Sequence, residues 1–157
     1  MKTALCTRLG IEVPIIQAPM GGAVGPALAA AVCNAGALGM LVLWRADHET
    51  VRRQIREMRA LTSRPFGVNL NLEFPQEERL EICLEERVPV ISFFWREDFH
   101  LVPRAKEAGA MVMHTVGSAA DAKRRRSGCR YHNCARLGGR RSRSRIGRDD
   151  AAYTGCR

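Results

Sequence analysis

The sequence has few aromatic residues, and it has no apolar run near the roughly 20 residues that a bilayer-spanning helix needs. Aromatic side chains make up 6% of the chain and apolar side chains 46%, so a core of useful size must be mainly aliphatic. The first ten residues also lack the charged-then-apolar layout of a secretion signal. We therefore expect a soluble, cytoplasmic protein of one domain with no membrane contact.

Common nucleotide-binding and acid–base signatures are absent as well. The chain contains no GxxxxGK[ST] phosphate loop, no GxGxxG fingerprint and no pair of carboxylates at a spacing suited to acid–base work. Cys6, Cys33 and Cys83 lie in apolar surroundings, and without a secretion signal we expect buried thiols rather than disulfides. The familiar nucleotide-binding functions therefore lose support.

The net charge of +9 is confined to the end of the chain. Residues 1–123 contain 14 basic and 14 acidic side chains, whereas residues 124–157 contain 11 arginines and 2 aspartates. This division predicts an ordered domain over residues 1–123 and a basic, disordered tail over residues 124–157. At face value such a tail could bind nucleic acid through phosphates.

Apolar runs and helical patterns alternate along residues 1–123. The predicted strands are Val13–Ala18, Gly39–Leu43, Phe66–Leu72, Val88–Phe94 and Ala110–Val116. The predicted helices are Gly25–Asn34, Asp47–Leu61, Pro75–Glu86 and Phe99–Ala108, with a further helix starting at Ser118–Lys123. Nearly continuous apolar strands indicate a parallel sheet covered on both faces, so the fold class is α/β.

Two architectures fit this alternation, and periodicity does not choose between them. One is a doubly wound open sheet. The other is a (β/α)8 barrel interrupted after about five of its eight units, because a complete barrel takes roughly 250 residues. In both, ligands bind at the carboxyl ends of the strands, so the residues that close each run are the candidate site residues.

Three features at these strand ends could bind a ligand. The first is a turn after the first strand, where glycine lets the backbone approach a ligand and methionine could lie against a ring system; its residues are Pro19, Met20, Gly21 and Gly22. The second is Asn69, an amide inside an apolar strand that needs hydrogen-bond partners. The third is His114, near the end of the fifth run. A plain turn, an amide bonded to backbone and a packed histidine are the structural alternatives.

Two tryptophans also follow strands. Trp44 and Trp95 come after the second and fourth runs, where each could line a pocket mouth or pack at the rim of the sheet. We expect rim packing for both.

Four segments in order resemble the nitronate monooxygenase family, also called 2-nitropropane dioxygenase-like. They are Ile15–Gly22, Pro65–Leu70, Pro89–Phe93 and Met113–Ser118, and the resemblance covers Met1 to about Lys123. Members of that family are FMN-binding (β/α)8 barrels, so the resemblance implies the barrel rather than the open sheet. It implies oxidation of a small alkyl nitronate by FMN and O2, giving a carbonyl compound and nitrite.

The resemblance also assigns roles to residues. It places Pro19, Met20, Gly21, Gly22 and Asn69 against FMN, and we add His114 as a pocket residue. The family's later Glu-Ala-Gly-Gly-His segment, which carries the active-site histidine, is missing, so the catalytic residue is unknown in this chain. Another FMN-barrel oxidoreductase is the alternative enzyme.

The tail can be interpreted as a shifted reading frame. If the codons from Arg125 are read one base later, synonymous choices give Ala-Gly-Arg-Gly-Val-Asp-Ile-Ile-Ile-Ala-Gln-Gly-Trp-Glu-Ala-Gly-Gly-His-Val, which is the missing segment. We therefore expect residues 125–157 to be out of frame rather than a nucleic-acid-binding arm. A zinc site is a weaker alternative; its possible ligands are Cys129, His132, Cys134 and Cys156. Because their spacing matches no common zinc finger, we expect no metal.

An incomplete barrel would leave a strand edge unpaired and apolar surface uncovered. For the 157-residue chain we accordingly expect poor solubility or a partly molten state, and doubtful activity.

Overall fold

The computed structural model of the chain describes residues 2–95 and 100–116. Within them lie four strands: β1 (Gly39–Val42), β2 (Phe66–Asn71), β3 (Val90–Phe94) and β4 (Met111–His114). Five helices accompany them: α1 (Ala4–Leu9), α2 (Pro26–Asn34), α3 (His48–Leu61), α4 (Glu77–Glu85) and α5 (Leu101–Glu107). Strands and helices alternate from α2 onward, as the sequence predicts.

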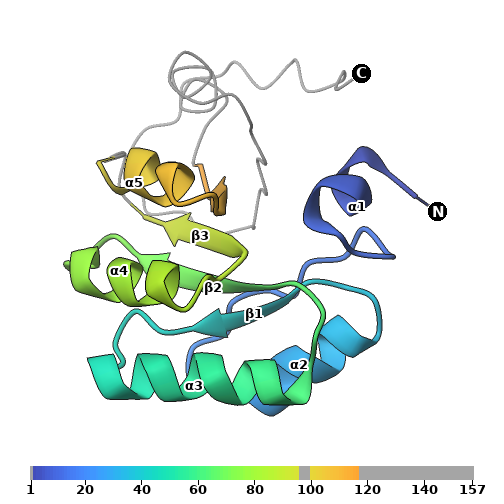
Figure 1. The fold of residues 1–157 in the computed structure, drawn as a ribbon, viewed down its shortest axis with the longest axis horizontal. Helices are drawn as coiled ribbons and strands as arrows, with labels where there is room; N and C mark the ends of the chain where they lie inside the picture. The colour runs from blue at the N-terminus through green and yellow to red at the C-terminus, as the bar shows by residue number, and fades with distance from the viewer. Residues whose placement is uncertain (1, 96–99, 117–157) are drawn as a thin grey trace, which may run out of the picture.

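All four strands run parallel in the order β1-β2-β3-β4. Each strand therefore pairs with the next one along the chain, which is the order of a parallel sheet built from successive strand–helix units. Figure 1 shows helices α2 and α3 along one side of the sheet, with α4 and α5 following β2 and β3. The α/β class is confirmed.

The first predicted strand, Val13–Ala18, is reduced to a single parallel bridge between Ile16 and Leu38. Pro14 has no N–H to donate, and Ile15 is 60% exposed. Two backbone bonds still attach this segment to β1, from the N–H of Gln17 to the carbonyl of Leu38 and from the N–H of Leu38 to the carbonyl of Ile15. It therefore follows the course of a strand without being a full one.

The helices form where local chemistry favours them. Asp47 caps α3 by accepting a hydrogen bond from the N–H of Thr50 at 2.8 Å, and Val51, Ile55 and Met58 are buried at helical spacing. Pro26 occupies the first turn of α2, where a missing N–H costs nothing. Helix α4 begins two residues later than predicted, because Gln76 turns inward and bonds to the strand ends.

Helix α1 is absent from the sequence-based prediction. Its six residues are too few to show a period, although Thr3 caps its start and Gly10 ends it in a left-handed conformation with φ of 68°. The predicted helix at Ser118–Lys123 and the tail after it lie outside the described residues. None of the described helices is long and apolar enough to cross a membrane.

Candidate functional site at the carboxyl ends of the strands

The sheet has two faces with different environments. One face packs against the helices through a core that includes Val68, Leu70 and Phe93. The other face carries Leu38, Met40, Val90 and Met113, which pack together with residues of the α1 region, Cys6, Leu9 and Ile11. Figure 1 places α1 beside the amino-terminal ends of the strands. This second face, here called the inner face, is therefore closed at its amino-terminal end by apolar packing.

Towards the carboxyl ends, the inner face becomes polar. Asn69 pairs in register with Ser92, and Ser92 pairs with Met113 of the inner-face cluster, so the three side chains share that face. Asn69 is 3% exposed, and its Nδ2 donates to the carbonyl and the Oγ of Ser92, each at 3.3 Å. The described residues donate no hydrogen bond to the Asn69 amide oxygen, which remains available to a ligand.

The turn after the first segment leaves space for a ligand. A Cβ built on Gly21 or Gly22 would meet no atom within 4 Å, and Gly22 has φ of 79°, which favours glycine. Met20 is 43% exposed and Pro19 is half-buried. A flat molecule could therefore approach this backbone closely.

Gln17 leads into that turn and carries an unusual amide. Its Oε1 and Nε2 are both buried, and neither makes a hydrogen bond within the described part of the chain. A buried amide without partners is costly, and an absent ligand or chain segment is the ordinary reason for one. This side chain is not among the site residues predicted from the sequence.

His114 does not join the other candidates. It pairs in register with Phe93, and the two ring centroids lie 6.2 Å apart. Because Phe93 belongs to the core under the helices, His114 lies on the face opposite Asn69. Its Nδ1 is 2.8 Å from the backbone carbonyl oxygen of Thr115.

Ser92, the partner of Asn69, is also not among the site residues predicted from the sequence. A serine in the apolar run Val90–Phe94 is a weak signal alone, because serine is small and bonds readily to backbone. The signal that could have identified it is register. Two polar residues at matching positions of neighbouring parallel strands face the same side of the sheet.

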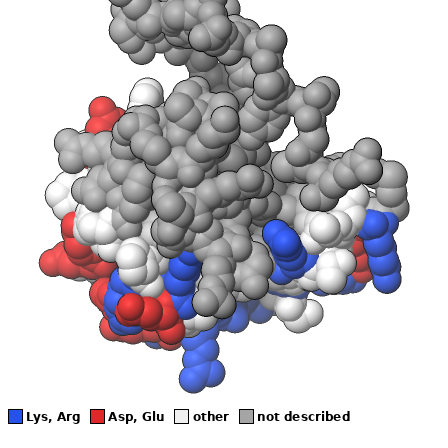
Figure 2. All heavy atoms as spheres, turned by 90° about the horizontal axis from the view of Figure 1, so that it is seen from above, with Lys and Arg blue, Asp and Glu red and all other residues white. Residues whose placement is uncertain are grey.

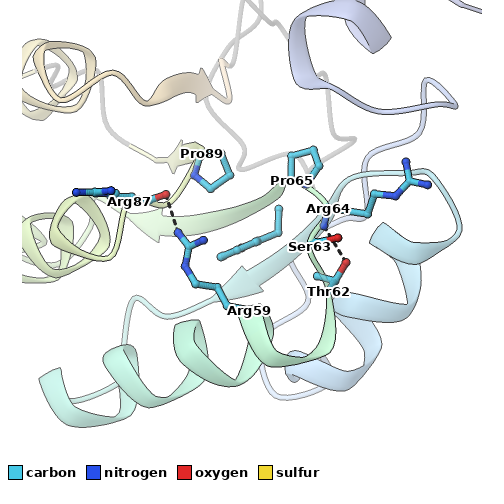
Figure 3. A pocket seen from close by; sticks show the side chains of 8 residues that line it. Arg59, Thr62, Ser63, Arg64, Pro65, Arg87 and Pro89 are labelled. Carbon is cyan, nitrogen blue, oxygen red and sulfur yellow. Dashed lines mark hydrogen bonds between the residues drawn. The ribbon is translucent and has the colours of Figure 1, made fainter.

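A hollow lies at the opposite edge of the sheet. It encloses about 510 Å³ between the end of α3 and the starts of β2 and β3, and Arg59, Arg64 and Arg87 border it. Figure 3 shows the Arg59 guanidinium directed at the backbone of Arg87, while the Arg64 and Arg87 side chains point away from the hollow. Arg64 bonds instead to Glu12 at 2.6 Å. The three charges therefore do not converge on one ligand.

Two of the buried thiols, Cys33 and Cys83, are unsuited to nucleophilic chemistry. Burial raises the pKa of the Cys83 thiol to about 12, and it also raises the pKa of Cys33. Cys6, Cys33 and Cys83 are free and buried, as the sequence predicts. The described residues contain no group of three or more metal-ligating side chains.

Comparison with known proteins identifies the family. The family model for nitronate monooxygenase matches residues 2–79. The nitronate monooxygenase of Paraburkholderia phytofirmans is 53% identical over 76 residues, which are 48% of this chain and 21% of that protein. The (3aS,4S,5R,7aS)-5-hydroxy-7a-methyl-1-oxo-octahydro-1H-indene-4-carboxyl-CoA dehydrogenase of Mycobacterium tuberculosis is 35% identical over 125 residues, 79% of this chain and 35% of that one. The chain thus spans about a third or less of these relatives.

The fold agrees with a solved structure. The structure of FabK from Thermotoga maritima superposes with a TM-score of 0.79 at 34% identity, covering 84% of this chain and 43% of that chain. The parallel sheet in sequential order is thus part of an α/β barrel, which decides between the two architectures that the sequence leaves open. With the match to residues 2–79, these findings show that the chain belongs, through its N-terminal half, to the nitronate monooxygenase family.

Proposed function

We propose that this chain carries the first half of the active site of an FMN-dependent nitronate monooxygenase. The reaction oxidises an alkyl nitronate with O2 to a carbonyl compound and nitrite. One observation carries the proposal: the matched residues 2–79 contain both the open glycine turn and the strand asparagine, each at the carboxyl edge of the sheet. That edge is where barrel enzymes bind their ligands.

The residues at this edge fit a flavin. The turn of Pro19, Met20, Gly21 and Gly22 is open on its surface, so its backbone could lie against a flat ring. The Asn69 amide offers a carbonyl oxygen while Ser92 holds its nitrogen. When bound, the flavin supplies the electron chemistry. The side chain of His114 starts on the other face of the sheet, so the geometry gives it no direct support as a flavin contact.

We further propose that residues 125–157 are read out of frame. The support is the family segment recovered from the codons one base later, which contains the missing histidine. The basic tail would then have no binding role of its own. Verified coding DNA that keeps the present frame, together with related genes that share this tail, would contradict this.

The proposed function is tested by comparing two proteins. One is the 157-residue chain, and the other is its frame-corrected and completed version. FMN binding is followed by flavin fluorescence, and oxygen uptake is measured with ethylnitronate. We expect the completed protein to bind FMN and consume oxygen only with the nitronate present. A completed protein that binds FMN but ignores nitronate would overturn the assigned reaction.

Asn69 gives a residue-level test in the completed protein. Asn69→Ala should weaken FMN binding about tenfold, because a hydrogen bond to a buried group contributes roughly 1–2 kcal/mol. Asn34→Ala is the matched control, since Asn34 bonds to Leu61 and Thr62 at the amino-terminal edge of the sheet. Equal loss of FMN affinity in both variants would remove Asn69 from the site.

A second enzymatic function has a specific observation in its favour. The Mycobacterium tuberculosis dehydrogenase, whose name contains a coenzyme A thioester, is 35% identical over 79% of this chain. The alternative is therefore a flavin-barrel oxidoreductase that acts on a thioester of coenzyme A. Reduction of bound flavin by an acyl-CoA, without any response to nitronate, would favour this alternative.

A further inference from the structure

We propose that Arg45 binds an anionic group of the ligand at the rim of the site. This inference rests on the proposed function, because it assumes that the ligand enters at the carboxyl edge of the sheet. Trp44 and Arg45 follow β1, and Phe74 follows β2, so all three stand at that edge. Together they are called the rim cluster.

The rim cluster holds a cation against two aromatic rings. Trp44 and Phe74 stack with ring centroids 5.2 Å apart and an interplanar angle of 16°. The Cζ atom of Arg45 lies 4.5 Å from the centroid of Trp44 and 5.4 Å from that of Phe74. The negative faces of the rings attract the guanidinium, and this attraction orients the charge.

Arg45, like Arg53, has no acidic partner among the described residues, whereas several other arginines do. Arg52, Arg56 and Arg104 all pair with glutamates on the helices. Arg45 makes neither an ion pair nor a hydrogen bond within residues 2–95 and 100–116. No described residue occupies its N–H groups, and a guanidinium fork suits the paired oxygens of a nitronate, carboxylate or phosphate.

The two loops that carry the rim cluster are fixed to each other. Gln76 is 1% exposed, and its Nε2 donates to the carbonyls of Trp44 and Asn71, each at 3.1 Å. Arg79 adds a bond from its Nε to the carbonyl of Ala46 at 2.7 Å. A charge presented by braced loops loses little freedom when it binds, which favours a binding role over a loosely held surface charge.

The ligand class is an organic anion with an apolar body. Arg45 binds the anionic oxygens, and the exposed edges of Trp44 and Phe74 contact the apolar part. Two sources share this chemistry: the nitronate group itself, or the phosphates of a coenzyme A thioester. They can be separated by experiment, because one is a small monoanion and the other a large polyanion.

The test measures binding of two anionic probes by tryptophan fluorescence in the 157-residue chain. Trp95→Phe leaves Trp44, the other of the two tryptophans, as the reporter beside Arg45. The probes are ethylnitronate and free coenzyme A, titrated at low and high salt. We expect saturable quenching by at least one probe, weaker at high salt. Quenching by ethylnitronate alone assigns the nitronate, and quenching by coenzyme A alone assigns the phosphates.

Arg45→Gln should weaken binding of that probe about tenfold, since a charge-assisted hydrogen bond is lost. Arg45→Lys keeps the charge but loses the fork, so its affinity for the probe should lie between that of the parent and that of Arg45→Gln. Arg53→Gln is the control, because Arg53 is an exposed arginine on α3 that bonds only to Thr50 among the described residues. Unchanged affinity in Arg45→Gln, or no binding of either probe to the parent, would overturn the inference.

FMN titration of the completed protein and its Arg45→Gln variant separates this inference from the proposed function. FMN binding without anion binding leaves the proposed function standing and removes the rim site. Anion binding at Arg45 without FMN binding leaves the rim site standing and removes FMN binding from the proposed function.

Discussion

Gly39 is the position where β1 and α2 come into closest contact. A Cβ built there would lie 2.1 Å from the carbonyl oxygen of Ala29 and 2.9 Å from the Sγ of Cys33. The Gly39 N–H also donates to that Sγ at 3.2 Å. Because backbone cannot give way as a flexible side chain can, the glycine fixes how closely the helix covers the strand.

Gly39→Ala should therefore destabilise the frame-corrected and completed protein by about 3 kcal/mol or more, at the upper end of the cost of overpacking a core. Urea unfolding followed by far-UV circular dichroism measures the change. Gly21→Ala is the matched control, because no atom lies within 4 Å of the added Cβ. Equal stability of the two variants would show that α2 moves away from β1 at little cost.

Individual residues also show what sequence alone can predict about the site. Asn69 is identifiable because an amide inside an apolar strand must find partners, and it does pair with Ser92. The face of the sheet that His114 occupies cannot be predicted from the sequence, because it depends on the register between β3 and β4. One residue of slip would exchange the two faces. Strand pairing fixes that choice, and local composition does not.

At the scale of elements, α4 is an acidic helix held between two basic ones. Glu86 accepts hydrogen bonds from Arg56 of α3 at 2.8 Å and from Arg52, and Glu81 accepts from Arg104 of α5 at 2.6 Å. Glu77 pairs with His100 at 2.9 Å. Figure 2 shows acidic and basic side chains interleaved along one edge of the described surface. These pairs join neighbouring helices outside the sheet.

Glu86 makes this arrangement sensitive to pH. The hydrogen bond from Arg56 is the main cause that lowers the pKa of Glu86 below its ordinary value, which is about 4.3. A lowered carboxyl pKa gives stability that is present above the unfolded value and is lost as pH falls through the folded value. The stability that Glu86 contributes is therefore lost at pH values below about 4.3.

In the frame-corrected and completed protein, Glu86→Gln should lower stability at pH 7 by about 0.5–1 kcal/mol, a small value because the arginines are well exposed. The difference from the parent should shrink as the pH falls from 7 to 3, because Glu86 becomes protonated in the parent. Urea unfolding at the two pH values measures it, with Glu57→Gln as the control, since Glu57 is exposed on α3. A difference that persists undiminished at pH 3 would show that Glu86 acts through packing rather than charge.

The elements predicted well are those whose burial pattern is local. Helix α3 shows its buried face at helical spacing, and β2 is apolar enough to be recognised without its neighbours. The first segment was predicted as a full strand, but Pro14 removes a donor and only β1 pairs with it among the described residues. Helix α1 was missed because six residues contain less than two turns. Its role in closing the inner face follows from tertiary packing.

At the scale of the whole molecule, the sheet has two edges that lack a second neighbour within the described residues. One is the Ile16 segment, which pairs only with Leu38, and the other is β4, which pairs only with β3. Ile15, at 60% exposure, stands at the first of these edges. In a closed barrel such edges pair with further strands, which removes both the open hydrogen-bonding groups and the exposed apolar surface.

The frame-corrected and completed chain should therefore unfold in one sharp, cooperative thermal transition, because closing the barrel joins the two edges through packed strands. The 157-residue chain should show a broad transition, with weak near-UV circular dichroism and binding of an apolar dye. Differential scanning calorimetry of both proteins at the same concentration makes the comparison. Flavin is omitted so that ligand binding does not add to stability. A sharp transition in the 157-residue chain, equal in enthalpy per residue to that of the completed one, would mean that five units suffice for a folded core and that the open edges are tolerated.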